Sequence, residues 1–221
     1  MSGAFYSVYM LQDLGLSYSQ VAIYTNITLA AMVLSYPLWG IFVQRYGCRP
    51  VGQLTIWPYV AILATWIFIN PLTAVWLIPI QRALAGLCWS GTQVANSTLL
   101  YKLVPSGDES SSYFGNWMAF TAIGSAGGPF IGGLLREALP EAGVVVAGMQ
   151  FAPLQVVFAL SALVCIVPAL LSRRLQEAEA TSPIYLLGQF RGNLVGYAFN
   201  YALFHVGHSE ERRAEAARGL G

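Results

Sequence analysis

The sequence predicts an all-α membrane protein built from six helices. Of its 221 residues, 56% are hydrophobic and 10% are charged, whereas about 25% of a soluble domain is charged. A helix needs about 20 apolar residues to cross a bilayer, and nearly every long uncharged run approaches or exceeds that length. These runs cover residues 14–44, 50–81, 83–101, 110–135 and 142–172.

The uncharged runs and the residues that interrupt them place the helices. We expect helices at residues 4–11, 18–43, 51–69, 72–103, 112–135 and 145–171. Pro37 is expected to kink the second helix, and the pair Asn70–Pro71 ends the third. Serines near residue 110 can cap the fifth helix.

The first expected helix is too short to cross a bilayer. Its eight or so residues rise about 12 Å, which is less than half of the hydrocarbon thickness. It is therefore either a re-entrant stub or the remainder of a truncated span, and truncation is the favoured explanation.

The chain divides into a six-helix transmembrane unit, residues 1–174, and a helical tail, residues 175–221. The best apolar window of the tail, residues 194–206, is too short to span a membrane. It predicts an interfacial or partner-packed helix. A charged, alanine-rich segment that begins at Ser209 predicts the start of another helical unit.

The placement of Lys and Arg residues predicts the orientation in the membrane. One side of the six-helix unit carries five of them and the other side carries only Arg136. We therefore expect the first side, and both ends of the unit, to face the cytoplasm. The five residues are Arg45, Arg49, Lys102, Arg173 and Arg174.

A polar stripe on the fourth helix is the strongest candidate for a solute pathway. At 100° per residue its members share an arc of about 80°. Arg82 lies about 15 Å beyond the helix start, where a lipid-facing charge costs about 2.5–3.5 kcal/mol. The stripe is therefore expected to line an aqueous pathway; the alternative is a structural pairing of Arg82 with a carbonyl or with Asp13. Its members are Arg82, Gly86, Trp89, Gln93 and Asn96.

Other polar and aromatic residues of the helices are weaker candidates. Asn26 and Asn116 are further candidates for the pathway, although such residues more often form interhelical hydrogen bonds, as is also expected of Tyr6 and Tyr9. Trp66 and other tryptophans are expected in the interfacial belt of the membrane.

The loop between the second and third helices carries a spaced pattern of glycine and arginine. Positive charge alone explains a short cytoplasmic loop of this kind. The spacing, however, resembles the signature loop of the major facilitator superfamily, where it serves as a gating loop. Gln44 stands where that pattern has an aspartate, so no gating ion pair on that carboxylate is implied. The matching residues are Gly40, Arg45, Gly47 and Arg49.

The fifth helix is rich in glycine, which in water costs about 1 kcal/mol per residue against alanine. In a membrane, small residues let helices approach closely. The pattern resembles the glycine–proline motif of the fifth helix in each half of these transporters. That resemblance implies a kinked helix that rocks against a partner, and plain close packing is the alternative. The motif residues are Gly124, Gly128, Pro129, Gly132 and Gly133.

Together these motifs resemble one six-helix repeat of the major facilitator fold, with Arg82, Gly86 and Gly91 similar to its fourth-helix pattern. Members join two such repeats around a central cavity. The stretch "GLCWSGTQVANSTLLYKLVP" resembles the second half of certain bacterial members, and "ERRAEAARGLG" resembles the start of an appended HEAT-type repeat. The resemblance implies that the carboxyl-terminal half is present, in a bacterial inner membrane, and that a six-helix amino-terminal half is its partner.

The resulting functional hypothesis is secondary active transport of a small solute by alternating access. The expected partners are membrane lipid, the solute and the missing half, with no nucleic acid and no cofactor. Coupling carboxylates are expected in the absent half, because no Asp or Glu lies within the helices after Asp13. A non-transporting scaffold on the same fold is the alternative.

An enzyme is not expected. The helices contain no nucleophile–base pair and no metal-binding motif, and His205 and His208 lie in the tail. The three cysteines, Cys48, Cys88 and Cys165, lack paired or metal-ligand spacing and are interpreted as reduced structural residues.

Overall fold

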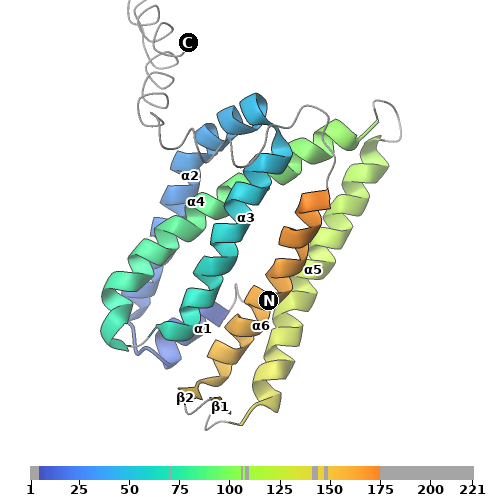
Figure 1. Cartoon of the computed structure of the whole chain (residues 1–221). Helices are drawn as coiled ribbons and strands as arrows, with labels where there is room; N and C mark the ends of the chain where they lie inside the picture. Colours follow the sequence, from blue (N-terminus) through green and yellow to red (C-terminus); the bar gives the residue numbers. More distant parts are fainter. Residues whose placement is uncertain are drawn as a thin grey trace, which may run out of the picture.

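The computed structural model describes residues 5–69, 71–105, 107, 110–140, 144–146 and 149–174. This part contains two strands, β1 (Val144–Val146) and β2 (Met149–Phe151), and two 3-10 turns, η2 (Trp66–Phe68) and η3 (Ser172–Arg174). The predicted tail helices lie outside the described residues. The α-helices (Figure 1) are α1 (Phe5–Gln12), α2 (Tyr18–Tyr46), α3 (Cys48–Thr65), α4 (Pro71–Leu103), α5 (Ser110–Ala138) and α6 (Pro153–Leu171).

The all-helical fold predicted from the sequence is confirmed, with one correction before α6. The helix expected from Val145 begins at Pro153, and the preceding segment forms a short antiparallel hairpin in which Val145 pairs with Gln150. Three consecutive valines favour a strand because their branched side chains are stiff. Proline favours the first turn of a helix, which explains the start of α6.

Within the described residues, four helices are long and apolar enough to cross a membrane: α2, α3 with η2, α5 and α6. At 33 residues, α4 is long enough, but it is not among the four. Polar residues such as Gln81 and Arg82 interrupt its apolar character. With eight residues, α1 is too short to span.

Small residues bring α2, α3 and α4 into close contact. A Cβ atom at Gly86 of α4 would meet the carbonyl oxygen of Thr28 on α2. At Gly91 it would meet the Thr55 side chain on α3 and the Trp39 ring on α2, the latter at 2.8 Å. This is how helices pack in lipid, where close backbone approach replaces the hydrophobic driving force.

Hydroxyl groups add polar contacts at the same crossing. The hydroxyls of Ser35 and Ser90 lie 2.7 Å apart and are buried. Those of Thr55 and Thr92 lie 3.0 Å apart. The Trp39 indole donates to the carbonyl of Leu87 at 2.8 Å. Helices α2, α3 and α4 therefore form the best-packed part of the described bundle.

Helix α5 lies at the edge of the bundle, beside α6 (Figure 1). Gly132 is its one buried residue. Large apolar side chains on it, such as Phe120 and Phe130, are 75% and 68% exposed. A helix with so little contact inside its own unit offers a broad apolar face to lipid or to a partner.

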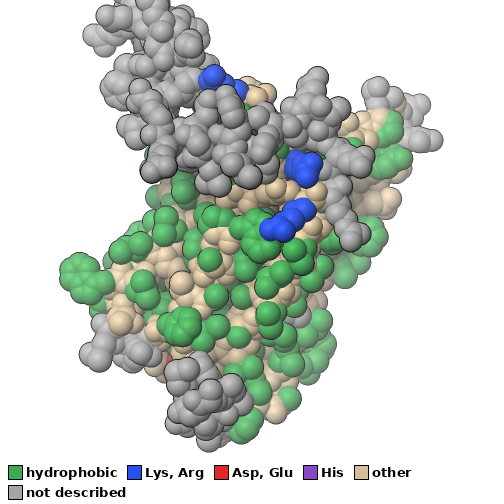
Figure 2. Space-filling view, in the orientation of Figure 1, with side chains coloured by type: hydrophobic (Ala, Val, Ile, Leu, Met, Phe, Trp, Pro, Cys, Tyr) green, Lys and Arg blue, Asp and Glu red, His purple; other side chains and the backbone are tan. Residues whose placement is uncertain are grey.

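Basic residues gather at one end of the bundle (Figure 2). This basic end is formed by the junction of α2 and α3, the end of α4 and the end of α6, and it carries Arg45, Arg49, Lys102 and Arg173. The hairpin, η2 and Arg136 at the end of α5 lie at the opposite end (Figure 1).

Candidate functional site

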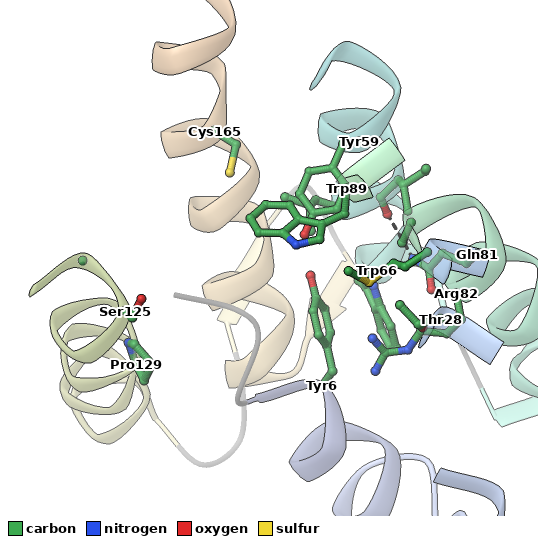
Figure 3. A pocket seen from close by; sticks show the side chains of 15 residues that line it. Tyr6, Thr28, Tyr59, Trp66, Gln81, Arg82, Trp89, Ser125, Pro129 and Cys165 are labelled. Atoms are coloured by element: carbon green, nitrogen blue, oxygen red, sulfur yellow. Dashed lines mark hydrogen bonds between the residues drawn. The ribbon is translucent and has the colours of Figure 1, made fainter. Parts of the chain in front are cut away.

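A cavity of about 610 Å³ lies between α5 and the rest of the bundle. This volume is typical of small-molecule sites, which range over about 300–1,000 Å³. Each of the six helices contributes to its wall (Figure 3). The lining includes Tyr6, Thr28, Tyr59, Trp66, Gln81, Arg82, Trp89, Ser125, Pro129 and Cys165.

Arg82 is the one charged side chain among the described residues that line this cavity. Its guanidinium carbon lies 4.8 Å from the ring centroid of Tyr6 and 5.4 Å from that of Trp66. Its Nε is buried and has no hydrogen-bond partner within the described part of the chain. Arg82 is therefore held by aromatic rings, which attract a cation through their electron-rich faces.

Asp13 does not neutralise Arg82. Partial burial raises the pKa of the Asp13 carboxyl, and the opposite charge that partly offsets this pKa shift is Arg136, at the end of α5. The sequence left open a pairing of Arg82 with Asp13, and the structure instead leaves the guanidinium without a carboxylate among the described residues.

Aromatic rings form much of the cavity wall. Tyr6 stacks on Trp66 with ring centroids 4.7 Å apart, and Tyr59 packs against Trp89 at 5.4 Å. Trp66 is only 2% exposed, so the prediction that it belongs to an interfacial belt was wrong. Its ring instead packs on Tyr6 and on Phe158 of α6.

Hydrogen bonds fix α1 against the wall of the cavity. The Tyr9 hydroxyl donates to the carbonyl of Ile69 at 3.0 Å and accepts from Gln155 Nε2 at 3.0 Å. Gln155 also donates to the carbonyl of Ile67 at 3.1 Å. The interhelical hydrogen bond expected of Tyr9 is confirmed. This network places Tyr6, one turn earlier on α1, beside Arg82.

Gln81 joins α4 to α3 next to Arg82. Its Nε2 donates to the carbonyl of Ile62 at 3.0 Å and to the Thr65 hydroxyl at 2.7 Å (Figure 3). Its Oε1 is buried without a hydrogen-bond partner in the described segments. The Oε1 acceptor of Gln81 and the N–H donors of Arg82 therefore lie on adjacent residues of the cavity lining.

The polar stripe of α4 does not face a single cavity. Arg82 and Trp89 line the large cavity, whereas Gln93 is exposed outside it. Asn96 lines a second cavity of about 240 Å³, with Arg49 and Cys48 near the basic end. The stripe also includes Gly86, which lies between Arg82 and Trp89 in sequence and packs closely on Thr28 of α2.

Asn26 and Asn116 are exposed and lie outside the lining of the large cavity. The structure therefore brings together two of the six predicted pathway residues, Arg82 and Trp89.

The glycine–arginine loop ties α2 and α3 to the end of α6. Gly47 has φ of 95°, which favours glycine, and its N–H donates to the carbonyl of Val43 at 3.0 Å. Arg49 donates to the carbonyl of Arg173 at 2.8 Å.

The other loop residues make different contacts. The Arg45 guanidinium lies 5.7 Å from the Tyr46 ring centroid. A Cβ at Gly40 would meet nothing within 4 Å.

The glycines of α5 differ in their surroundings. Gly132 is packed against the Phe5 ring, which a Cβ atom would approach to 2.6 Å. At Gly124 and Gly133 a Cβ atom would meet nothing within 4 Å. Gly128 is partly buried. Gly124 and Pro129 line the large cavity, and Pro129 lies across it from Arg82 (Figure 3).

Sequence reasoning missed several lining residues. Gln81 could have been found from its position next to Arg82 in an apolar helix. Tyr59 and Thr28 carry no such signal, because aromatic and hydroxyl residues are common on packed membrane helices. Gln155 does not line the cavity but bonds to Tyr9 and Ile67, and it was missed because it lies near the hairpin, where a helix interior was expected.

Comparison with known proteins places the chain in a family. Residues 1–203 match the sequence profile of the Major Facilitator Superfamily. No solved structure matches the chain. Two curated relatives are the multi-drug resistance efflux pumps PmrA of Streptococcus pneumoniae serotype 4 (strain ATCC BAA-334 / TIGR4) and of strain ATCC BAA-255 / R6.

Each relative is 31% identical over 135 residues, which are 58% of this chain and 32% of the relative. The match therefore spans about a third of the length of these curated relatives. The family match extends over most of the chain and agrees with the apolar helices. The chain belongs to the Major Facilitator Superfamily and is an integral membrane protein.

Proposed function

We propose that this chain is one six-helix unit of a transporter that moves a small solute across the membrane by alternating access. The observation that carries this proposal is the cavity that all six helices line around one arginine. An arginine within the membrane costs free energy unless its side chain faces a water-filled cavity or a partner group. The efflux-pump relatives support a transport function.

The second half of the transporter is proposed to pack on α5. Most of α5 is exposed, and a Cβ atom at Gly115, Gly124 or Gly127 would meet nothing within 4 Å. These open glycines suit a helix from another unit. An in-frame gene segment upstream of the Met1 codon that encodes six more apolar spans supports this pairing; a stop codon directly upstream contradicts it.

The basic end is proposed to face the cytoplasm of a bacterial inner membrane, because cytoplasmic loops carry the excess of Lys and Arg. A cysteine placed at Gln44 then escapes an impermeant maleimide in intact cells. Labelling at that position in intact cells contradicts this orientation.

The transport proposal is tested by Arg82→Ala in a bacterial strain depleted of its own efflux pumps. Mass spectrometry measures the cell-associated amounts of a panel of organic solutes. Expression of the gene, with any upstream in-frame segment, is expected to change the cell-associated amount of at least one solute relative to cells that carry the empty vector. Arg82→Ala is expected to abolish that change at equal membrane abundance, because it removes the one charge among the described lining residues.

Arg136→Ala is the matched control, because Arg136 is an exposed arginine outside the cavity lining. It is expected to retain the wild-type solute amounts. If Arg82→Ala behaves like the wild type, or if the gene changes no solute, the transport role is wrong and a scaffold on the same fold becomes the better explanation.

A further inference from the structure

We propose that the large cavity selects an organic anion that carries a planar aromatic ring. This inference rests on the proposed transport function, because it names the class of solute that the same cavity would take. Three features of the wall carry it: the unneutralised charge of Arg82, the surrounding rings and the absence of acidic residues from the described lining.

The first step concerns charge. The Arg82 guanidinium has aromatic rings at 4.8 Å and 5.4 Å and no carboxylate partner among the described residues. Rings attract its charge but accept hydrogen bonds poorly, and its buried Nε has no acceptor in that part of the chain. A guanidinium offers five N–H donors in a planar fork that matches a carboxylate. A bound anion would therefore supply the negative charge and the hydrogen-bond acceptor that the described residues do not provide for Arg82.

The second step concerns shape. Tyr6 and Trp66 flank Arg82, and the Tyr59–Trp89 pair lies on the adjoining wall (Figure 3). Tyr6 and Trp66 are buried and stack on each other, so they hold Arg82, and the ring left for a ligand is that of Trp89. A flat ring face favours offset stacking of another ring at centroid distances of about 4.5–7 Å. Trp89 is 40% exposed, so part of its surface is available to a ligand. A volume of about 610 Å³ leaves room for a ligand with one or two rings.

The third step concerns the competing ligand classes. A cationic aromatic would share the cavity with Arg82 and meet like charge at short range. None of the described lining residues is Asp or Glu, so no wall group attracts a cation by charge. A neutral aromatic would gain the stacking alone. We therefore expect the cavity to bind an aromatic anion most tightly, a neutral aromatic less tightly and an aromatic cation most weakly.

The test uses three probes that share one ring system and differ in charge: 2-naphthoate, 2-naphthylmethanol and 2-naphthylmethylammonium. Their binding to the purified protein, expressed with any upstream in-frame segment, is measured in detergent micelles by equilibrium dialysis, with protein-free micelles subtracted. We expect 2-naphthoate to bind about tenfold more tightly than the alcohol, a difference of about 1.4 kcal/mol, because hydrogen bonds between charged groups are stronger than those to a neutral hydroxyl. The ammonium probe is expected to bind most weakly.

Arg82→Gln is expected to remove the preference for 2-naphthoate, and Arg82→Lys to retain a weaker one, because an ammonium keeps the charge without the planar fork. Arg136→Gln is the control and is expected to leave the ranking unchanged. Circular dichroism and a monodisperse elution profile establish that each variant is folded.

Equal binding of the three probes, tighter binding of the ammonium probe, or no binding of 2-naphthoate overturns the proposal. So does a preference for 2-naphthoate that survives in folded Arg82→Gln. These outcomes do not bear on the cellular solute amounts. If transport in cells depends on Arg82 but the three probes bind in a different order, the proposed solute class is wrong and the transport function is not affected.

Discussion

Two glycines of α4 decide how closely α2 and α3 approach it. A Cβ atom at Gly86 would meet the Thr28 carbonyl, and at Gly91 it would meet Thr55 and Trp39. Backbone and packed rings cannot move aside as the end of a flexible side chain can. Arg82 and Trp89, on either side of Gly86 in sequence, both line the large cavity, whereas Gln93 does not.

Gly86→Ala is therefore expected to destabilise the bundle by about 1–3 kcal/mol, the usual cost of overpacking. Gly40→Ala adds the same methyl group to α2 where it meets nothing within 4 Å, so it is expected to leave stability unchanged or raise it slightly. Thermal unfolding in detergent measures both variants. Equal unfolding temperatures for the two would contradict the close crossing.

At the residue scale the sequence predicted the charged member of the cavity lining, Arg82, and missed Gln81 beside it as well as Tyr59 and Thr28. Arg82 could be predicted because a charge within an apolar helix costs free energy unless it faces a cavity or a partner group. Trp66 was assigned to the interface because tryptophan is common there. Its burial depends on Tyr6 and Phe158, which lie far away in sequence.

At the scale of elements, α1 shows how a short helix is held in place. It cannot span the membrane, and its position depends on packing and on the Tyr9 hydroxyl, which bonds to Ile69 and Gln155. Because Tyr6 lies on the same helix, displacement of α1 would remove a ring from beside Arg82. The network is thus a support for the cavity.

Tyr9→Phe is expected to lower the free energy of unfolding by about 1–3 kcal/mol, because it leaves the buried Ile69 carbonyl without its hydroxyl donor. Tyr18→Phe is the matched control, since Tyr18 is 82% exposed. Chemical unfolding in mixed micelles compares the two. A loss of stability no greater for Tyr9→Phe than for Tyr18→Phe would show that the network does not anchor α1.

Helix positions were largely predictable, whereas the start of α6 was not. Long uncharged runs and the Asn70–Pro71 pair placed most boundaries within a few residues, because the bilayer sets helix length. The hairpin at Val144–Phe151 was missed. An apolar run at a membrane surface fits a strand or a helix equally well, and valines and Pro153 decide between them only locally.

At the scale of the whole molecule, we propose that the large cavity is filled with water and belongs to a solute pathway. No single helix forms it; residues from Tyr6 to Cys165 meet there through tertiary packing. This is why the sequence predicted a stripe but could not delimit the cavity. Access of water to the cavity lining is the property that would distinguish a solute pathway from an apolar gap between helices.

Cysteine accessibility tests this claim most directly. Ala85 lines the cavity, whereas its neighbour Leu84 is 46% exposed outside the lining. In a background with Cys48, Cys88 and Cys165 replaced by alanine, Ala85→Cys and Leu84→Cys are each treated in open membranes with an anionic methanethiosulfonate. Only a thiol that reaches water ionises and reacts readily. We expect rapid modification at Ala85→Cys and little at Leu84→Cys; the reverse order, or no reaction at Ala85→Cys, would contradict the aqueous pathway.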